Sequence, residues 1–98
     1  MPSRIEAVPG LRVAAFGAEA VVFDPLSWNA HLLNPSAWAV LEQLLESPLS
    51  VEQIAAFLER VLRPEEEAGA RLHAQHLISE LVSLGLVRPV RESALAVR

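Results

Sequence analysis

The sequence contains no cysteine, no lysine and no long uninterrupted apolar run. Without cysteine there is no disulfide, no thiolate metal site and no cysteine nucleophile, and nothing requires an oxidising compartment. All eight basic residues are arginines, against twelve acidic residues and a net charge of -4, so the basic surface typical of a phosphate-backbone binder is missing. No apolar stretch approaches the roughly 18 residues that read as a membrane span, and the amino end lacks the pattern of a signal peptide. These absences favour a cytoplasmic protein that binds neither nucleic acid nor membrane.

Length and composition indicate one small folded domain. The 98 residues are too few for a second hydrophobic core. A content of 52% hydrophobic and 20% charged residues is ample for one core and too apolar for a disordered chain. We therefore expect a single domain over residues 1–98, with an ordered core over about 8–87, a short lead-in before it and a partly loose tail after it.

Three short apolar segments in the first third of the chain predict strands. They are Leu11–Phe16, Ala20–Phe23 and Asn29–Leu33. A short connection containing Gly17 separates the first two, as a hairpin requires. Asp24 and Pro25 then occupy the first two positions of a type I turn, where the carboxylate can accept a backbone hydrogen bond. The pattern indicates a three-stranded antiparallel meander.

The remaining sequence predicts three helices. Asn34 is a good N-cap with Pro35 after it, and Pro48 follows the end of the first helix. Residues 50–53, Ser-Val-Glu-Gln, form a capping box that starts the second helix. Residues 64–67, Pro-Glu-Glu-Glu, open the third helix, where the positive end of the helix dipole stabilises acidic side chains. Gly85 closes it as a left-handed cap. The expected fold is α+β and winged-helix-like, a three-stranded antiparallel sheet followed by a three-helix bundle, a shape shared by DNA readers and protein binders.

The residues that could carry chemistry do not form a recognisable catalytic or metal site. The chain has no phosphate-binding glycine loop and no nucleophile elbow. His73 and His76 lie three apart on the third helix and could share a metal with His31 or Glu80, but no further ligand is evident. The alternative is that both histidines are polar residues beside an apolar stripe and that His31 faces solvent or a partner. We expect no enzyme activity, no metal and no cofactor.

The third predicted strand lacks the features that block edge-to-edge pairing. Asn29–Leu33 contains no charge, no proline and no glycine. At a sheet edge, its free N–H and C=O groups would be open to an added strand. Trp28 precedes it at a turn, where burial is difficult, so its ring is a candidate contact residue.

The third helix carries two stripes at helical spacing. Its core stripe is Ala70, Ala74, Leu77, Leu81 and Leu84. A second, mixed stripe consists of Arg71, Gln75, Ile78 and Val82. A groove between this second stripe and the third strand would fit an extended peptide. Alternatively, Ile78 and Val82 merely widen the core face, and the residues alone leave the two readings even.

Four blocks of the chain resemble successive blocks of the PqqD family of small peptide chaperones, also called RiPP recognition elements. They lie at residues 21–24 (Val-Val-Phe-Asp), 31–37 (His-Leu-Leu-Asn-Pro-Ser-Ala), 49–54 (Leu-Ser-Val-Glu-Gln-Ile) and 81–87 (Leu-Val-Ser-Leu-Gly-Leu-Val). The resemblance covers about residues 8–87. It differs at Ser27-Trp28, where relatives usually have Ser-Gly. The 24–25 turn and the 86–87 ending are similar to those of stand-alone relatives, including those linked with HPr-kinase-like proteins.

The resemblance implies a non-catalytic chaperone that binds the leader segment of a ribosomally made precursor peptide. In that family the leader adds as a strand beside the third strand, packs against the third helix and is presented to a modifying enzyme, often a radical SAM maturase. The implied peptide-binding residues are Trp28, Asn29, Ala30, His31, Leu32, Leu33, Arg71, Gln75, Ile78 and Val82. The alternative is a winged-helix DNA-binding or protein-interaction regulator, and an open strand edge also permits a homodimer.

Overall fold

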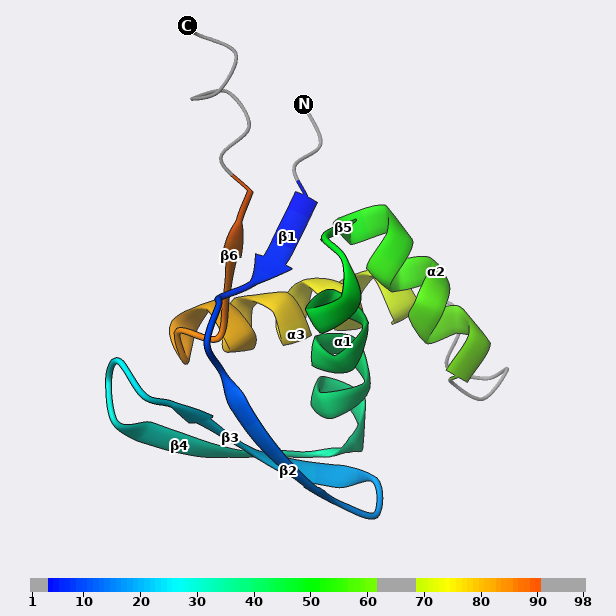
Figure 1. Cartoon of the computed structure of the whole chain (residues 1–98). Helices are drawn as coiled ribbons and strands as arrows, with labels where there is room; N and C mark the ends of the chain where they lie inside the picture. Colours follow the sequence, from blue (N-terminus) through cyan, green and yellow to red (C-terminus); the bar gives the residue numbers. More distant parts are fainter. Residues whose placement is uncertain (1–3, 62–68, 91–98) are drawn as a thin grey trace, which may run out of the picture.

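The computed structural model describes residues 4–61 and 69–90 and contains nine regular elements within them. In chain order these are β1 (Arg4–Ala7), β2 (Arg12–Phe16), β3 (Glu19–Asp24), β4 (Asn29–Leu33), α1 (Pro35–Glu46), β5 (Leu49–Ser50), α2 (Val51–Val61), α3 (Ala70–Ser83) and β6 (Val87–Pro89). The strands form two antiparallel three-stranded sheets, in the orders β2-β3-β4 and β5-β1-β6 (Figure 1). The α+β class and the three helices are confirmed. The predicted opening of the third helix at residues 64–67 falls outside the described residues.

The β2-β3-β4 sheet is the predicted meander. Phe16 pairs with Glu19, so Gly17 and Ala18 form a two-residue turn between β2 and β3. Gly17 has a φ of +63°, a left-handed conformation that the favoured two-residue hairpin turns require at their first position. The meander lies below α1 in Figure 1, with β3 in its centre. All three predicted strands are therefore present at nearly the predicted boundaries.

The prediction of a single sheet is wrong, because three short pieces of distant sequence form a second one. β1 pairs with β5, where Ile5 lies opposite Leu49, and with β6, where Glu6 lies opposite Arg88. The Arg88 guanidinium contacts the Glu6 carboxylate at 2.9 Å, a favourable cross-strand pair. Regular elements are therefore present from Arg4, at the start of β1, to Pro89, at the end of β6.

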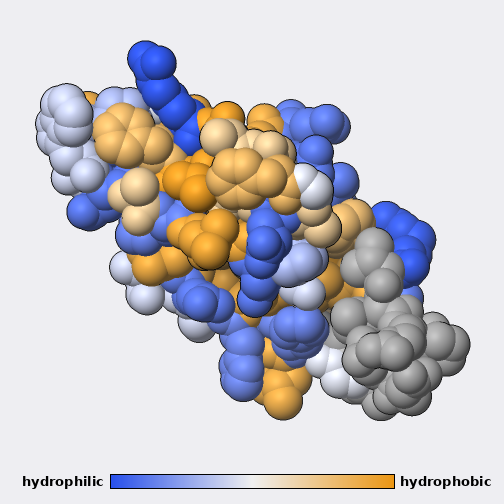
Figure 2. Space-filling view, turned by 90° about the horizontal axis from the view of Figure 1, so that it is seen from below, coloured by the Kyte–Doolittle hydropathy of each residue, from blue (hydrophilic) through white to orange (hydrophobic). Residues whose placement is uncertain are grey.

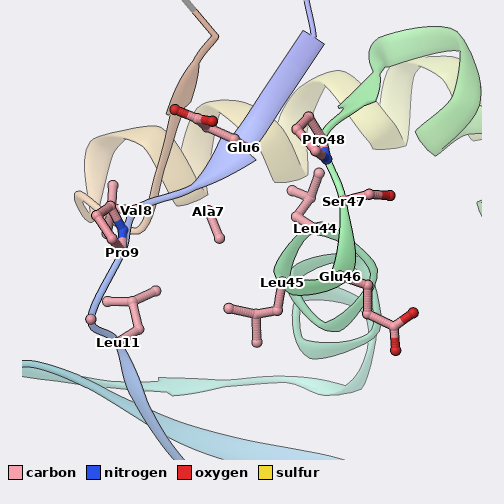
Figure 3. Close-up of a pocket in the computed structure, with 11 residues that line it drawn as sticks. Glu6, Ala7, Val8, Pro9, Leu11, Leu44, Leu45, Glu46, Ser47 and Pro48 are labelled. Atoms are coloured by element: carbon pink, nitrogen blue, oxygen red, sulfur yellow. The ribbon is translucent and has the colours of Figure 1, made fainter.

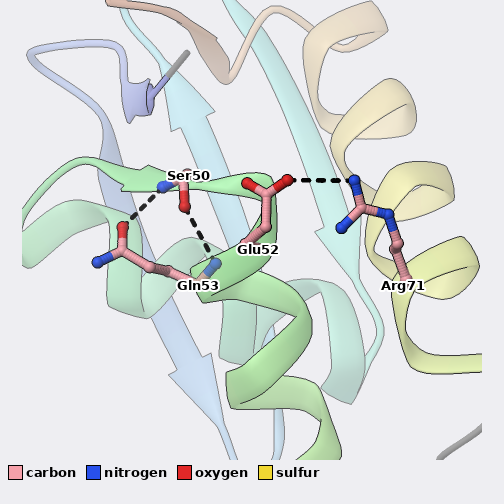
Figure 4. Close-up of polar contacts among 4 residues, drawn as sticks. All are labelled: Ser50, Glu52, Gln53 and Arg71. Carbon is pink, nitrogen blue, oxygen red and sulfur yellow. Dashed lines mark hydrogen bonds and ion pairs between the residues drawn. The ribbon is translucent and has the colours of Figure 1, made fainter. Parts of the chain in front are cut away.

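The helix caps are those that the sequence predicts. The Asn34 side-chain oxygen accepts a hydrogen bond from the Ala37 N–H at 2.9 Å at the start of α1. At the start of α2, the Gln53 N–H donates to the Ser50 hydroxyl and the Ser50 N–H donates to the Gln53 side chain, a reciprocal capping box (Figure 4). These bonds satisfy N–H groups that have no partner inside the helix. Local sequence thus fixes where α1 and α2 begin.

The end of α3 is a Schellman motif, which directs the chain into β6. Gly85 has a φ of +79° and donates its N–H to the Val82 carbonyl, and the Leu86 N–H donates to the Leu81 carbonyl. Leu81 and Leu86 are both fully buried, so the motif also brings its apolar contact into the core. The predicted glycine cap is confirmed.

One hydrophobic core joins the inner face of the meander to the helices and the second sheet. The buried meander side chains are Ala20, Val22 and Leu33. Three residues of the predicted α3 core stripe are also buried, namely Ala74, Leu77 and Leu81. Leu84 is half-buried and packs against this core. The side chain of Ala70 lies outside the described set. Within the described ranges, no helix combines the length and apolar character needed to cross a bilayer.

Candidate functional site: the free edge of β4

β4 lies at an edge of the meander. Its register joins it to β3 from Asn29 opposite Asp24 to Leu33 opposite Ala20, and within the part of the chain that the structure describes it pairs with no other strand. None of its five residues is charged, proline or glycine. The edge therefore lacks the usual features that prevent another chain from pairing with it.

The hydrogen-bond alternation identifies which backbone groups of β4 are free. The residues that close a two-residue hairpin form a hydrogen-bonded pair, and such pairs alternate along an antiparallel ladder. Starting from Phe16 opposite Glu19, every second residue of β3, from Glu19 to Phe23, bonds to β2, and the residues between them bond to β4. The backbone groups of Ala30 and Leu32 consequently point away from β3. These two residues supply the free donors and acceptors of the edge.

The turn that leads into β4 is held by side-chain and backbone hydrogen bonds. The Asp24 carboxylate accepts the Leu26 N–H at 2.9 Å, as predicted, and the Asp24 carbonyl accepts the Trp28 N–H at 2.8 Å. Trp28 has a φ of +64°, a left-handed conformation that tryptophan rarely adopts. Its ring is 80% exposed and meets the edge of the Phe23 ring at a centroid distance of 5.9 Å. The exposed aromatic that the sequence predicts is confirmed, in a position where glycine would fit without strain.

The side chains of β4 alternate between the core and the outside. Leu33 is buried on the inner side, while Leu32 is 65% exposed on the outer side. His31 shares the inner side with Leu33 and is half-buried, and its Nε2 is buried without a hydrogen-bond partner among the described residues. Of the expectation that His31 faces solvent or a partner, the solvent-facing alternative is wrong for this nitrogen. An unpaired buried nitrogen is costly, so a group that packs beside β4 and offers a polar atom would gain a favourable contact.

The second stripe of α3 is only partly separate from the core. Ile78 retains 9% of its surface and belongs to the core cluster, so for this residue the alternative that it widens the core face is correct. Gln75 is exposed, and Val82 is 43% exposed. This leaves the two ends of the stripe and its middle glutamine available to a partner.

Arg71, at the start of that stripe, is engaged in an ion pair with α2. Its guanidinium contacts the Glu52 carboxylate at 3.1 Å, and both side chains are more than half exposed (Figure 4). A hydrogen bond from its own backbone and a second from Arg71 hold the pKa of the Glu52 carboxyl below its usual value. An exposed pair of this kind contributes little to stability. Arg71 can therefore exchange Glu52 for another carboxylate at small cost.

A hollow that sequence reasoning missed lies between the β1–β2 connection and the carboxyl end of α1 (Figure 3). It has a volume of about 370 Å³ and is lined by Glu6, Ala7, Val8, Pro9, Gly10, Leu11, Leu44, Leu45, Glu46, Ser47 and Pro48. None of the predicted peptide-binding residues lines it. No sequence signal marks it, because it is formed by two segments more than 30 residues apart.

The described residues hold no ready-made metal site. Nowhere in ranges 4–61 and 69–90 do three histidine, aspartate or glutamate side chains gather closely enough to ligate an ion. Among these residues, His73 and His76 are thus not assembled with His31 or Glu80 into a group of ligands. The chemistry available at the β4 edge is hydrogen bonding and apolar contact.

An α+β domain whose meander ends in an unprotected strand belongs to a class of small domains suited to binding extended peptides by strand addition. A family model described as coenzyme PQQ synthesis protein D (PqqD) matches residues 19–87. The match covers most of the chain, and the chain therefore belongs to the PqqD family. No curated protein and no solved structure matches it. The family is one of non-catalytic, peptide-binding accessory proteins of peptide maturation, which agrees with the predicted class.

Proposed function

We propose that this chain is a chaperone that binds the leader segment of a ribosomally made precursor peptide as a fourth strand along β4. The observation that carries the proposal is the free edge of β4, where Ala30 and Leu32 offer unpaired backbone donors and acceptors. A leader strand pairing there antiparallel would make about two hydrogen bonds with each of these residues. Backbone bonds supply affinity without requiring a particular leader sequence.

Selectivity then comes from the side chains around the edge. A leader lying beside β4 meets Trp28 at the turn and the exposed side chains of Gln75 and Val82 on α3. Arg71 can accept an acidic leader residue in place of Glu52, and His31 Nε2 gains a hydrogen-bond partner from a polar leader group. Ile78 contributes the apolar floor from within the core. In this proposal the ten sequence-predicted residues contribute in three ways: through backbone hydrogen bonds of β4, through exposed side chains around its edge, and through the apolar side chain of Ile78 beneath the leader.

The chaperone then presents the bound leader to a modifying enzyme in the cytoplasm, of which a radical SAM maturase is the type that the family suggests. In this proposal α2 and α3 lie beside the meander in a winged-helix-like arrangement, and the leader binds between β4 and α3. The chain supplies no catalytic group to the modification. Its contribution is to order an otherwise disordered peptide, whose conformational entropy would oppose productive binding to the enzyme.

A titration of the isotope-labelled chain tests the proposal. The probes are synthetic candidate leader peptides, each with a scrambled peptide of the same composition as control. We expect saturable amide shifts along β4 and at the exposed residues of α3 with the leader only. Saturable binding with shifts confined to the hollow of Figure 3 would contradict the site, and equal binding of the scrambled peptide would contradict the function.

A further inference from the structure

The outer face of the meander is a second exposed surface, distinct from the β4 edge. The pairing register places alternate residues of the three strands on this face, opposite the buried Ala20, Val22 and Leu33. Its members are Arg12, Ala14, Phe16, Glu19, Val21, Phe23, Ala30 and Leu32. Figure 2 shows the molecule from this side, with apolar surface gathered over its middle and hydrophilic surface around it. We call these eight residues the outer face.

The outer face is apolar but for one charge of each sign at opposite ends. Phe16 is 55% exposed. Arg12 lies at one end of the ladder and Glu19 at the other, four residues apart along the strand direction, about 13 Å. Neither makes an ion pair within the described part of the chain. A face of this kind is complementary to itself.

We infer that the outer face joins two copies of this chain in a face-to-face dimer. A two-fold axis that lies between the sheets and runs across the strands reverses the strand direction. It therefore places Arg12 of one copy over Phe16 and beside Glu19 of the second copy, and the symmetry repeats this contact. The apolar side chains between the two charged ends interdigitate, as in other pairs of stacked sheets about 10 Å apart. The β4 edge lies at the side of this interface and stays open.

The size of the face indicates a weak dimer. The five paired positions along the three strands cover about 17 by 14 Å in projection. The exposed Leu26 and Trp28 at the end of the sheet enlarge the contact only modestly. The interface is smaller than the roughly 800 Å² per partner of a standard stable complex. We therefore expect dissociation constants in the micromolar range or weaker, and a monomer in dilute solution.

Sedimentation equilibrium of the full chain between about 10 µM and 1 mM tests the dimer, because a weak association is populated only at high concentration. We expect the average mass to rise from 10.7 kDa toward twice that value. Arg12→Glu and Glu19→Arg should each weaken self-association about 3- to 10-fold, since each turns two ion pairs into two like-charge pairs. The double variant Arg12→Glu with Glu19→Arg should restore it. Both sites are exposed strand positions, so all three variants keep the fold.

Four results would overturn the inference. The first is a monomer at every concentration. The second is a dimer that ignores the charge reversals, which would place the contact elsewhere. The third is a dimer in which the Ala30 and Leu32 amides are as slow to exchange as those of His31 and Leu33, which would mean that two β4 edges pair with each other. If the leader peptide itself shifts the outer-face amides of a monomeric chain, the leader and not a second copy covers the face.

Discussion

Replacing Ala30 by proline removes one of the two free backbone N–H groups of the β4 edge without touching the ladder between β3 and β4. The Ala30 N–H points away from β3, so the substitution breaks no bond of the meander. Proline is tolerated on edge strands for this reason. The residue before it, Asn29, is already extended, as the proline ring requires. The variant should therefore fold and fail to accept a strand.

The loss of leader affinity follows from the bonds that the variant cannot make. A net hydrogen bond is worth about 1 kcal/mol, and the leader carbonyl that loses its donor adds about 1–2 kcal/mol when it is removed from water. The sum of about 2–3 kcal/mol corresponds to a dissociation constant about 30- to 150-fold weaker. The proline ring also occupies the space that the leader backbone needs. The figure is thus a lower estimate.

Ala15→Pro is the matched control, because Ala15 occupies the equivalent position on the opposite edge of the same sheet. Ala15 lies on β2, and its N–H points away from β3. The substitution is again alanine to proline. Isothermal titration with the leader peptide measures affinity, and urea unfolding measures the free energy of unfolding for both variants. We expect equal stability changes and a loss of binding for Ala30→Pro alone. Wild-type affinity for a folded Ala30→Pro chain would refute the reasoning, and loss of binding for Ala15→Pro alone would move the leader to β2.

Four further substitutions test other parts of the account. Trp28→Gly should raise the free energy of unfolding by about 1 kcal/mol in a urea titration. Glycine removes the strain of a left-handed non-glycine residue, about 1–3 kcal/mol, and this gain exceeds the loss of the ring contact with Phe23, about 0.5–1.5 kcal/mol. A clear decrease in the free energy of unfolding would show that Trp28 is not strained. Val82→Asp should weaken leader binding and change the free energy of unfolding by no more than about 1 kcal/mol. Ile78→Asp should lower the free energy of unfolding by roughly 4 kcal/mol or more, because it places a carboxylate in the core. Equal effects of the two variants on binding and on stability would contradict the assignment of Val82 to the binding surface and of Ile78 to the core. The pKa of Glu52 is lowered in the folded state, so its contribution is present above the unfolded pKa and lost as the pH falls through the folded one. Thermal unfolding of Glu52→Gln should therefore show a shallower loss of stability below about pH 5 than the parent chain, and an unchanged pH profile would argue against the shift.

The meander and the helix caps could be predicted because their signals are local. Gly17, the Asp24 turn and the Asn34 cap each act within a few residues, and the structure contains the bonds that these residues favour. The second sheet could not be predicted from the same kind of signal. β1, β5 and β6 contain two to four residues each and come from three distant parts of the chain. Runs this short show no periodicity, so only tertiary pairing defines them.

The candidate site was predictable in its backbone and less so in its side chains. A strand without charge, proline or glycine marks β4 as open, but its place at the sheet edge depends on the pairing order. Helical periodicity places Ile78 between the core and the mixed stripe, and only packing decides that it is buried. The ion pair between Arg71 and Glu52 joins two helices whose relative position the sequence does not specify. The left-handed Trp28 stands at the position for which the family resemblance implies a glycine.

Hydrogen exchange at the individual amides of β4 tests the central claim most directly, because the claim concerns which main-chain groups are free. In the unbound chain the amides of Ala30 and Leu32 should exchange rapidly, while those of His31 and Leu33, which bond to β3, should be protected. Saturation with the leader peptide should slow Ala30 and Leu32 to rates similar to those of His31 and Leu33. Protection of Ala30 and Leu32 before any peptide is added, or their continued rapid exchange in the saturated complex, would contradict the account.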